Sequence, residues 1–428
     1  MPSTVDSSTE VVIVGGGQAG VAMSEHLQQR GIDHIVLEKD RVAEAWRTRR
    51  WDSLVANGPA WHDRFPTQTF DETDADSFAT KDDVADYFQK LVDRKNLPVR
   101  TGVTVNSVEA RRRKPGYMVS TSSGEISADY VVAATGPFQT PKIPDVIPAD
   151  TGLTQIHSSD YRNPEQLDSG AVLVVGAGSS GVQIAEELQR SGRSVYLAVG
   201  PHDRPPRSYR NRDFCWWLGV LGKWDMVTPP AGAEHVTIAV SGANGGHTVD
   251  FRELARSGIT LLGRANSYSD GALHLGDDLR ANIARGDENY LSLLREADEY
   301  VDRNGLDLPE DPEAHILGSE PDCVRQPILE LDLEQAGVST VIWATGFGLD
   351  YSWLKIDDVL DDQGIPVHKR GVSPVPGVYF LGLPWLSRRG SSFIWGVWHD
   401  AKYLADQISI QRMYRDYRPS HPSLVQTA

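Results

Sequence analysis

Two stretches of the chain share one pattern of apolar and polar positions. In each, a short run of consecutive apolar residues leads into a glycine-rich turn, and apolar residues then recur at helical spacing. The first stretch is VVIVGGGQAGVAMSEHL at residues 11–27, and the second is VLVVGAGSSGVQIAEEL at residues 172–188. A continuous apolar run is typical of a strand that is buried on both faces of a parallel sheet. Each stretch therefore predicts a buried strand, a tight turn and a helix.

The pattern continues beyond each helix. Gly31 ends the first helix, and HIVLE at 34–38 predicts a second strand, so this region forms a βαβ unit; Gly192 holds the matching position in the second copy. Two further apolar runs, DYVVAATGPF at 129–138 and VSTVIWATGF at 338–347, both end in Ala-Thr-Gly. This repetition predicts two related nucleotide-binding halves.

The glycines of the two turns have the spacing that a dinucleotide needs. In such a loop, the first glycine permits a tight turn, the second lets the backbone approach a pyrophosphate, and the third lets helix and strand pack closely. The glycines are Gly15, Gly17 and Gly20 in the first loop and Gly176, Gly178 and Gly181 in the second. The helix N-terminus adds free N–H groups and a positive dipole. We therefore expect two dinucleotide sites; two tight turns without a ligand are the alternative.

This order of elements predicts an α/β fold with two Rossmann-like dinucleotide-binding domains, as in two-domain flavoprotein monooxygenases and disulfide reductases. We expect a discontinuous first domain, residues 1–147 and 347–428, and a second domain, residues 148–346, with a helical insert at about 205–335. Prolines between 137 and 148 mark the crossing between the domains. A length of 428 residues suits such a division.

Composition narrows the expected partners and compartment. The net charge of −17 argues against nucleic acid or an anionic membrane as a partner. No apolar run reaches the roughly 18 residues of a membrane span, and the polar start shows no secretory signal. The two cysteines, Cys215 and Cys323, give no disulfide framework, so a cytoplasmic location is expected. No spacing of His, Cys and Asp indicates a metal site.

The residue after the second strand distinguishes the two sites. Glu38 stands where a carboxylate binds ribose hydroxyls, so the first site suits FAD. At the same distance from the second loop the chain has Val199, and a basic loop follows that contains Arg204 and Arg207. Guanidinium groups bind phosphate, so we expect them to hold the 2′-phosphate of NADPH. A merely solvated basic loop is the alternative.

NADPH and FAD on one chain imply hydride transfer into a flavin. Disulfide reductases of this architecture need a closely spaced cysteine pair, and Cys215 and Cys323 are far apart. Dioxygen is the common alternative acceptor, and it adds to reduced flavin to give a C4a-(hydro)peroxyflavin.

With these features the chain resembles the class B flavoprotein monooxygenases. HSSDY at 157–161 carries part of the resemblance: His157 and Tyr161 fit the linker motif of that family, whereas Thr151 and Leu153 replace its Phe and Gly. Tyr161 in place of Trp is similar to the flavin-containing and plant indole-pyruvate branches, not to the Baeyer–Villiger enzymes.

A second segment, VANGPAWHDRF at 55–65, resembles the active-site segment of the bacterial trimethylamine-type enzymes. The resemblance implies that Asn57 is the catalytic residue above the flavin. Taken alone, Asn-Gly-Pro is also a strong turn signal, so a turn residue is the alternative.

The other expected cofactor-binding residues adjoin the glycine loops, the second strand and the two Ala-Thr-Gly motifs. They are Gln18, Ala19, Lys39, Trp46, Arg47, Val105, Ala134, Thr135, Gly136, Ser179, Ser180, Ala344, Thr345 and Gly346. Tryptophans 385, 395 and 398 are candidate walls of an aromatic substrate pocket, and ordinary packing is the alternative for them.

Together these features predict an NADPH- and O₂-dependent FAD monooxygenase that oxygenates a small nucleophilic molecule at nitrogen or sulfur. Baeyer–Villiger or carbon-hydroxylating chemistry is one alternative. An NADPH-dependent flavin reductase and a non-catalytic redox sensor are two others. The sequence identifies neither the substrate nor the oligomeric state, and a homodimer is left as an alternative to a monomer.

Overall fold

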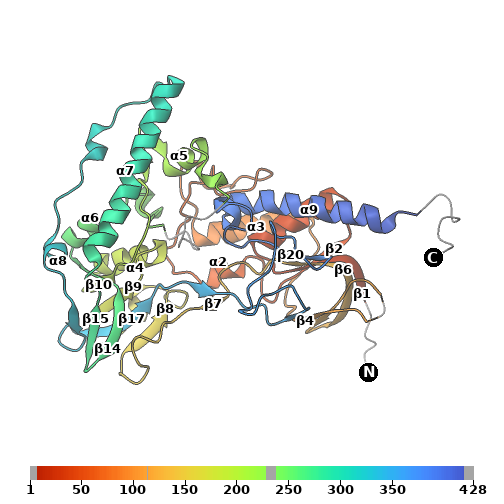
Figure 1. The fold of residues 1–428 in the computed structure, drawn as a ribbon, viewed down its shortest axis with the longest axis horizontal. Helices are drawn as coiled ribbons and strands as arrows, with labels where there is room; N and C mark the ends of the chain where they lie inside the picture. Colours follow the sequence, from red (N-terminus) through yellow and green to blue (C-terminus); the bar gives the residue numbers. More distant parts are fainter. Residues whose placement is uncertain (1–6, 113, 228–237, 419–428) are drawn as a thin grey trace.

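The computed structural model describes residues 7–112, 114–227 and 238–418, whose two largest sheets lie one after the other along the long axis of the molecule (Figure 1). The first sheet has eight strands and contains the first βαβ unit. Its strands are, in spatial order, β19 (Leu354–Lys355), β4 (Val105–Ala110), β5 (Tyr117–Thr121), β6 (Gly124–Ala133), β1 (Ser7–Val14), β2 (His34–Leu37) and β3 (Val99–Arg100), with β20 (Val378–Phe380) paired to β6. The C-terminal part of the chain thus completes the first domain.

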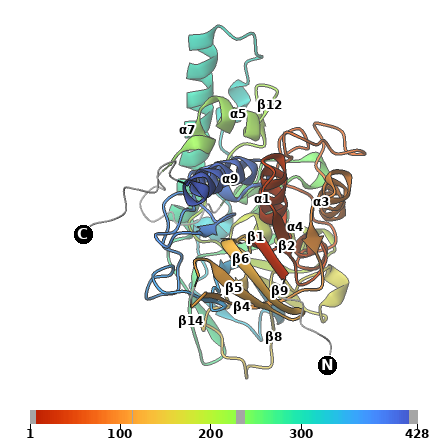
Figure 2. The ribbon, with the colours of Figure 1, turned by 90° about the vertical axis from the view of Figure 1, so that its right-hand side faces the viewer.

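Three helices cover one face of this sheet (Figure 2). They are α1 (Gln18–Gln29), α3 (Lys81–Lys95) and α9 (Ile394–Asp416). Because α9 packs against α1, every residue from Ala19 to Leu27 is buried. Helix α3 agrees with its sequence pattern: Thr80 and Asp83 form a capping box, and Asn96 ends the helix in the left-handed conformation.

The second sheet is entirely parallel and contains the second βαβ unit. Its strands are, in spatial order, β13 (Ile259–Leu262), β10 (Val195–Ala198), β9 (Ala171–Val175), β17 (Val338–Trp343) and β8 (Thr154–His157). Helix α4 (Ser179–Arg190) follows the glycine loop after β9. Adjacent strands follow the Rossmann order, which confirms the predicted fold class.

The predicted insert at 205–335 is not one inserted unit. Strand β13 lies inside that range and pairs with β10 in the main sheet, so two separate excursions flank it. Its short apolar run, ITLL, follows Gly258 and was not recognised as a buried strand. The first excursion holds β11 (Ser208–Tyr209), β12 (Arg212–Asp213), α5 (Phe214–Val220) and α6 (Phe251–Arg256). The second holds β14 (Ala265–Ser269), β15 (Ala272–Leu275), α7 (Leu279–Asn304), α8 (Asp322–Arg325) and β16 (Glu330–Asp332).

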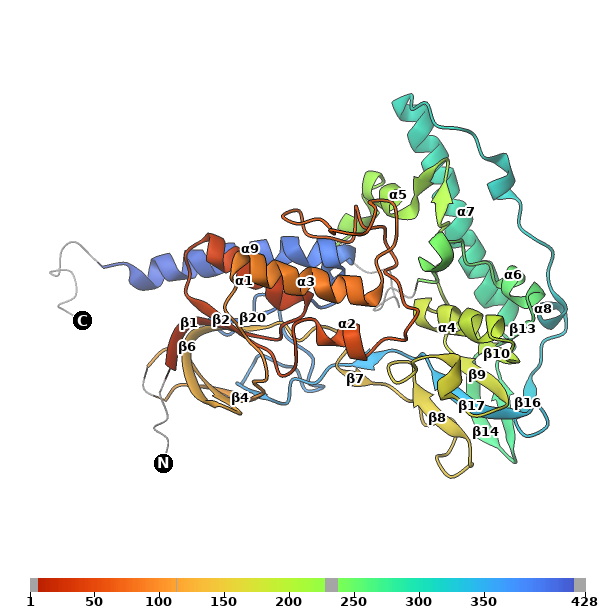
Figure 3. The ribbon, with the colours of Figure 1, turned by 180° about the vertical axis from the view of Figure 1, so that it is seen from behind.

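The chain crosses between the two domains twice, and the crossings pair with each other. Strand β7 (Thr140–Pro141) and strand β18 (Phe347–Gly348) form an antiparallel pair between the two sheets (Figure 3). Short helices complete the structure: α2 (Glu44–Thr48), η1 (Pro164–Gln166), η2 (Lys223–Asp225), η3 (Ala243–Gly245), η4 (Pro312–His315) and η5 (Arg389–Ser392). Within the described ranges, no helix is both long and apolar enough to cross a membrane.

Candidate functional site

The two glycine loops have the same geometry, and each is closed by an Ala-Thr-Gly motif. Gly15 has φ +110° and Gly176 has φ +118°, the left-handed region that favours glycine. A Cβ on Gly15 would lie 2.6 Å from the carbonyl oxygen of Ala134, and a Cβ on Gly176 would lie 2.4 Å from that of Ala344. The two Ala-Thr-Gly motifs therefore repeat in space as they do in sequence.

The third glycine of each loop also allows a backbone contact. A Cβ on Gly20 would lie 1.8 Å from the carbonyl oxygen of Gly15, and Gly181 has the same relation to Gly176. By contrast, nothing lies within 4 Å of a Cβ on Gly17. Gly17 caps α1 and has open space around its Cβ position, and Gly178 caps α4 in the same extended conformation. This cradle suits a pyrophosphate.

Glu38 lies at the end of β2, beside the first loop. Its Oε2 accepts a hydrogen bond from the N–H of Gly16 at 2.6 Å, and its Oε1 accepts one from the N–H of Asp40 at 2.9 Å. These bonds fix the orientation of the carboxylate. The backbone N–H of Val103 donates to the carbonyl oxygen of Glu38, so Val103, which sequence reasoning missed, lies closer to this corner than Val105 on β4.

The equivalent position of the second domain, directly after β10, has no acidic residue. Val199 is completely buried, and its N–H donates to the carbonyl oxygen of Leu262 on β13. Gly200 follows, and a Cβ on it would lie 3.8 Å from Cγ of Arg264, at the end of β13. The side chain of Arg264 is exposed and has no acidic partner among the described residues. Sequence reasoning missed Arg264 because β13 was not recognised.

Arg204 and Arg207 do not form a free basic loop. Both are buried, so the alternative of a solvated loop is wrong for these two residues. Arg204 binds Asp287 through Nη2 at 2.7 Å, and Arg207 binds Asp213 through Nη2 at 2.5 Å. A phosphate-binding role for either guanidinium would require it to leave a buried ion pair, which is costly. Their predicted contact with a 2′-phosphate is not tested by these distances, and it stays a prediction.

Asn57 and Arg207 are brought together at the junction of the domains. Nη1 of Arg207 donates to the carbonyl oxygen of Asn57 at 2.7 Å. The side-chain oxygen of Asn57 accepts a hydrogen bond from Nε2 of Gln183 on α4 at 2.9 Å. Because Gln183 also donates to the carbonyl oxygen of Val240, it fixes the amide of Asn57 against the second domain. Asn57 therefore links the first domain to the helix of the second glycine loop.

Other predicted cofactor residues lie around the two loops. Nε2 of Gln18 donates to the carbonyl oxygen of Ser392 at 2.8 Å, and Oγ of Ser179 donates to that of Ile238 at 2.6 Å. Arg47 on α2 pairs with Asp86 of α3 at 2.7 Å, and the N–H of Ala43, which caps α2, donates to the carbonyl oxygen of Gly16 in the first loop. The remaining positions are as follows: Ala19 is buried, Lys39 is exposed, Trp46 and Ser180 are half-buried, and Thr135, Gly136, Thr345 and Gly346 follow β6 and β17.

The linker motif connects the two Ala-Thr-Gly segments. The ring of His157, at the end of β8, bonds through Nε2 to the carbonyl oxygen of Gly346 at 3.0 Å and packs edge-on against Phe347. Burial lowers the pKa of His157, so the ring is neutral at pH 7. The hydroxyl of Tyr161 donates to Glu187 of α4 at 2.7 Å, and burial raises its pKa. His157 thus positions the backbone at Gly346, and Tyr161 positions α4. Neither residue presents an unpaired polar group to a ligand.

A further segment at the site follows β20, and sequence reasoning assigned only Trp385 of this segment to the site, as a candidate pocket wall. A Cβ on Gly382, which has φ +85°, would lie 2.9 Å from Cβ of Ala19 on α1. The segment from 382 to 392 therefore runs beside the first glycine loop. The signal was available: GVYFLG is a short apolar strand that ends in glycine, like β1 and β9.

An aromatic cluster stands at the end of this segment, where α9 begins. The ring of His62 lies 5.2 Å from that of Trp395 and 5.5 Å from that of Trp224, and Trp61 flanks it at 5.3 Å. Trp398, by contrast, packs on His26 beneath α9 at 4.2 Å. Trp395 therefore belongs to this aromatic cluster and Trp398 packs on His26, whereas the pocket walls predicted at Trp385, Trp395 and Trp398 stay predictions.

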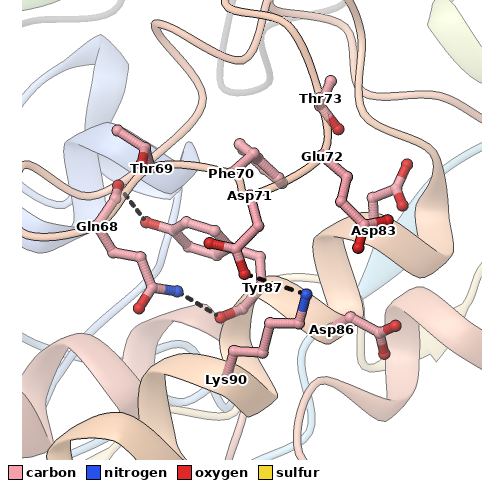
Figure 4. Close-up of a pocket in the computed structure, with 10 residues that line it drawn as sticks. All are labelled: Gln68, Thr69, Phe70, Asp71, Glu72, Thr73, Asp83, Asp86, Tyr87 and Lys90. Carbon is pink, nitrogen blue, oxygen red and sulfur yellow. Dashed lines mark hydrogen bonds and ion pairs between the residues drawn. The ribbon is translucent and has the colours of Figure 1, made fainter.

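A shallow hollow on the surface lies between α3 and the loop before it, apart from these groups (Figure 4). Its lining is polar and acidic: Lys90 pairs with Asp71 at 3.1 Å, and Gln68 and Tyr87 bond to each other's carbonyl oxygens. None of the predicted site residues lines it. In the part of the chain that the structure describes, no group of His, Cys, Asp and Glu could hold a metal ion.

Two Rossmann-like folds, each with a glycine loop before a helix and only the first with a carboxylate beside that loop, define a protein with two dinucleotide-binding folds. The family described as pyridine nucleotide-disulphide oxidoreductase matches residues 12–210. An uncharacterized oxidoreductase CzcO-like of Geobacillus kaustophilus is 34% identical over 402 residues, which cover 93% of this chain and 98% of that protein. The indole-3-pyruvate monooxygenase YUCCA1 of rice is 27% identical over 426 residues, which cover 95% and 92% of the two chains.

A flavin-containing monooxygenase from Stenotrophomonas maltophilia has a similar structure, with a TM-score of 0.66 and 19% identity, over 95% of this chain and 99% of that chain. The chain belongs to the class B flavoprotein monooxygenase family. The predicted family is thereby confirmed, and the protein is a flavin monooxygenase-type oxidoreductase.

Proposed function

We propose that the protein is an NADPH- and O₂-dependent FAD monooxygenase that oxygenates a small nucleophilic molecule at nitrogen or sulfur. The observation that carries the proposal is the difference between two otherwise equal glycine loops: a fixed carboxylate stands behind the first and a buried valine behind the second. One loop thus suits a nucleotide with a free ribose, and the other suits a nucleotide with a phosphorylated one.

The residues of the first loop fit FAD. The open space at Gly17 admits a pyrophosphate, and Glu38 presents a carboxylate that backbone N–H groups already hold in place. Bound FAD would supply the acceptor for a hydride and the centre that passes electrons to dioxygen. The protein's own part is to hold the two nucleotides, exclude water and orient the substrate.

The surroundings of the second loop fit NADPH, but the arginine that would bind its 2′-phosphate is Arg264 and not Arg204 or Arg207. Arg204 and Arg207 are engaged with Asp287 and Asp213, whereas Arg264 is exposed beside Gly200 at the end of the neighbouring strand. A 2′-phosphate at this corner would meet a guanidinium without breaking a buried pair. The preference for NADPH is therefore assigned to Arg264 in this proposal.

The substrate would lie between the two loops, near Asn57 and the cluster of Trp61, His62, Trp224 and Trp395. An uncharged amide is able to donate a hydrogen bond and to accept one without adding charge to a dry pocket. Aromatic walls favour a small, partly apolar nucleophile such as an amine or a sulfide.

Thiol–disulfide exchange, which the description of the matching family suggests, has little support from the cysteines. Burial raises the pKa of Cys215 well above that of a free thiol, and it raises that of Cys323 as well. The two cysteines also belong to separate apolar clusters. Neither thiol is therefore activated, and no pair is formed.

The deciding experiment follows oxygen and NADPH together. The purified protein is expected to be yellow with FAD and to consume O₂ and NADPH in equal amounts when a suitable amine or sulfide is present, with an oxygenated product seen by mass spectrometry. NADPH loss without oxygenated product across amines, sulfides and ketones would favour a flavin reductase. Binding of both nucleotides without turnover would favour a redox sensor.

A further inference from the structure

The segment from 382 to 392 carries an arginine whose charge has no adequate partner among the described residues. The side chain of Arg389 is 13% exposed, and its only acidic neighbour among the described residues is Asp203, at 3.9 Å. Its Nε is buried and without a hydrogen-bond partner in the described ranges. A guanidinium stays charged at pH 7, so burying one without hydrogen bonds is expensive. A bound anion would compensate the charge of this guanidinium.

Arg388, the adjacent arginine, has a close acidic partner, although its Nε, like that of Arg389, has no hydrogen-bond partner in the described ranges. Arg388 binds Asp225 through Nη1 at 2.6 Å and lies over the ring of Trp395. The backbone N–H of Arg389 donates to the carbonyl oxygen of Met226. Both contacts hold the segment against the end of η2, so the weak pairing of Arg389 does not come from a loose segment.

The position of Arg389 points to the second glycine loop. Asp203 pairs with Ile238 in an isolated bridge, and Ile238 accepts the hydrogen bond from Oγ of Ser179. Ser179 is the first residue of α4, directly after Gly178. Arg389 therefore reaches, from the first domain, the same wall of residues that lines the N-terminus of α4.

We propose that Arg389 binds a phosphate group of the nicotinamide nucleotide held by the second glycine loop, so that the first domain supplies part of the binding charge. The inference rests on the proposed function, because it requires that this loop binds the nucleotide. It implies that nucleotide binding fastens the segment from 382 to 392, and with it the start of α9, to the second domain. Asp203, which is partly exposed, would then give up its distant contact to the incoming phosphate.

The test compares Arg389→Gln with Arg388→Gln, using the flavin-loaded full-length protein. Calorimetric titration with NADP⁺ and with NAD⁺ gives Kd for each variant. Loss of one charge-assisted contact is expected to raise Kd about ten- to a hundredfold for Arg389→Gln and to leave it within about twofold for Arg388→Gln. An equal loss for both nucleotides would place Arg389 on the pyrophosphate, and a loss confined to NADP⁺ would place it on the 2′-phosphate.

Thermal unfolding separates this role from a purely structural one. Without nucleotide, Arg389→Gln is expected to melt at the same temperature as the wild type or above it, because an uncompensated buried charge is removed. Unchanged Kd values in a variant that melts lower would overturn the inference and make Arg389 a structural partner of Asp203. If the wild type itself binds neither nucleotide, the proposed function fails; if the wild type binds and Arg389→Gln binds equally well, only this inference fails.

Discussion

The two dinucleotide folds share a loop but differ in how they hold the helix that follows it. Helix α1 is sealed between the first sheet and α9, and even its polar residues Ser24, Glu25 and His26 are buried. Helix α4 keeps a polar side, and its acids are tied to other segments: Glu187 accepts from Tyr161 and Ser53, and Glu186 from His247. Helix α1 is thus enclosed more completely than α4, although it also has polar contacts, such as the ion pair of Glu25 with Lys95 at 3.2 Å.

This difference matches the tasks expected of the two sites. A tightly retained flavin needs a site whose geometry does not change, and burial on all sides provides that. A nucleotide that enters and leaves in each cycle needs a site that opens, and polar tethers at a surface break at little cost. Under the proposed function, the more enclosed site retains FAD and the other exchanges the nicotinamide nucleotide.

The largest expected effect comes from filling the open position of the first loop. Gly17→Val places a side chain where nothing lies within 4 Å, so the protein should fold yet lose nearly all flavin, because the pyrophosphate can no longer approach. The measurement is the ratio of flavin to protein absorbance after purification. Gly178→Val is the matched change in the second loop and should keep the flavin while weakening NADPH. A folded Gly17→Val protein with full flavin content would refute the assignment of the first site.

The next effect concerns the residue between the two folds. Asn57→Leu removes the hydrogen bond with Gln183. It also removes the side-chain amide of Asn57 from the proposed substrate site. We expect the rate of flavin reduction by NADPH in anaerobic stopped flow to stay within about a few-fold, because hydride transfer uses no contact of this side chain. Under air, most electrons should appear as hydrogen peroxide instead of oxygenated product. Normal coupling would show that Asn57 is only a turn and linker residue.

Acid should weaken the first fold through His26. Burial and Arg30 lower the pKa of this ring to about 4, from an ordinary value near 6.5. The unfolded chain therefore binds the proton more readily, and stability is lost as the pH falls from about 6.5 towards 4, by about 3 kcal/mol in total.

The measurement for His26 is the dependence of the melting temperature on pH. His26→Phe keeps a ring against Trp398 and should melt with a flatter dependence on pH below 6.5. An equally steep acid dependence in that variant would assign the effect to other groups.

A smaller effect is expected at the corner beside Gly200. Arg264→Ala should raise KM for NADPH about tenfold and leave KM for NADH nearly unchanged, since only the former carries the 2′-phosphate. Arg207→Ala is the informative comparison: its guanidinium is buried against Asp213, so that change should lower the melting temperature and affect both nucleotides alike. If Arg207→Ala, and not Arg264→Ala, raised KM for NADPH alone, the 2′-phosphate would bind at the loop that contains Arg204 and Arg207.

The smallest effect concerns a tether of α4. Glu186 raises the pKa of His247, which is partly exposed. The bond therefore stabilises the fold at pH values below the ordinary pKa and is lost as the pH rises through the raised value, with a contribution of at most about 1 kcal/mol after solvent screening. His247→Gln should lower the melting temperature slightly at pH 6 and not at pH 9, opposite in sign to the dependence at His26. A change of equal size at both pH values would show that the charge of His247 is not involved.

The sequence alone determined the features that depend on neighbouring residues. Gly15, Gly20 and their counterparts could be assigned because a strand, a turn and a helix follow one another without interruption. The exchange of Glu38 for Val199 could be assigned because the distance from the loop to the end of the next strand is nearly constant in a βαβ unit. The paired Ala-Thr-Gly motifs followed from the same periodicity, and the structure places them in equivalent positions.

Only the tertiary structure decided where long side chains find their partners. From the sequence, Arg204 and Arg207 were predicted to bind a phosphate. In the structure Arg204 pairs with Asp287, which lies on the distant α7, and Arg207 pairs with Asp213. Arg264 lies beside Gly200 and Arg389 beside Asp203, although β13 and the segment after β20, which bring them there, are both far along the chain from Gly176. A guanidinium pairs with whichever acid the fold brings within reach, and burial makes that choice costly to reverse. Loop geometry is local and readable in sequence, whereas the placement of charge depends on which distant elements pack together.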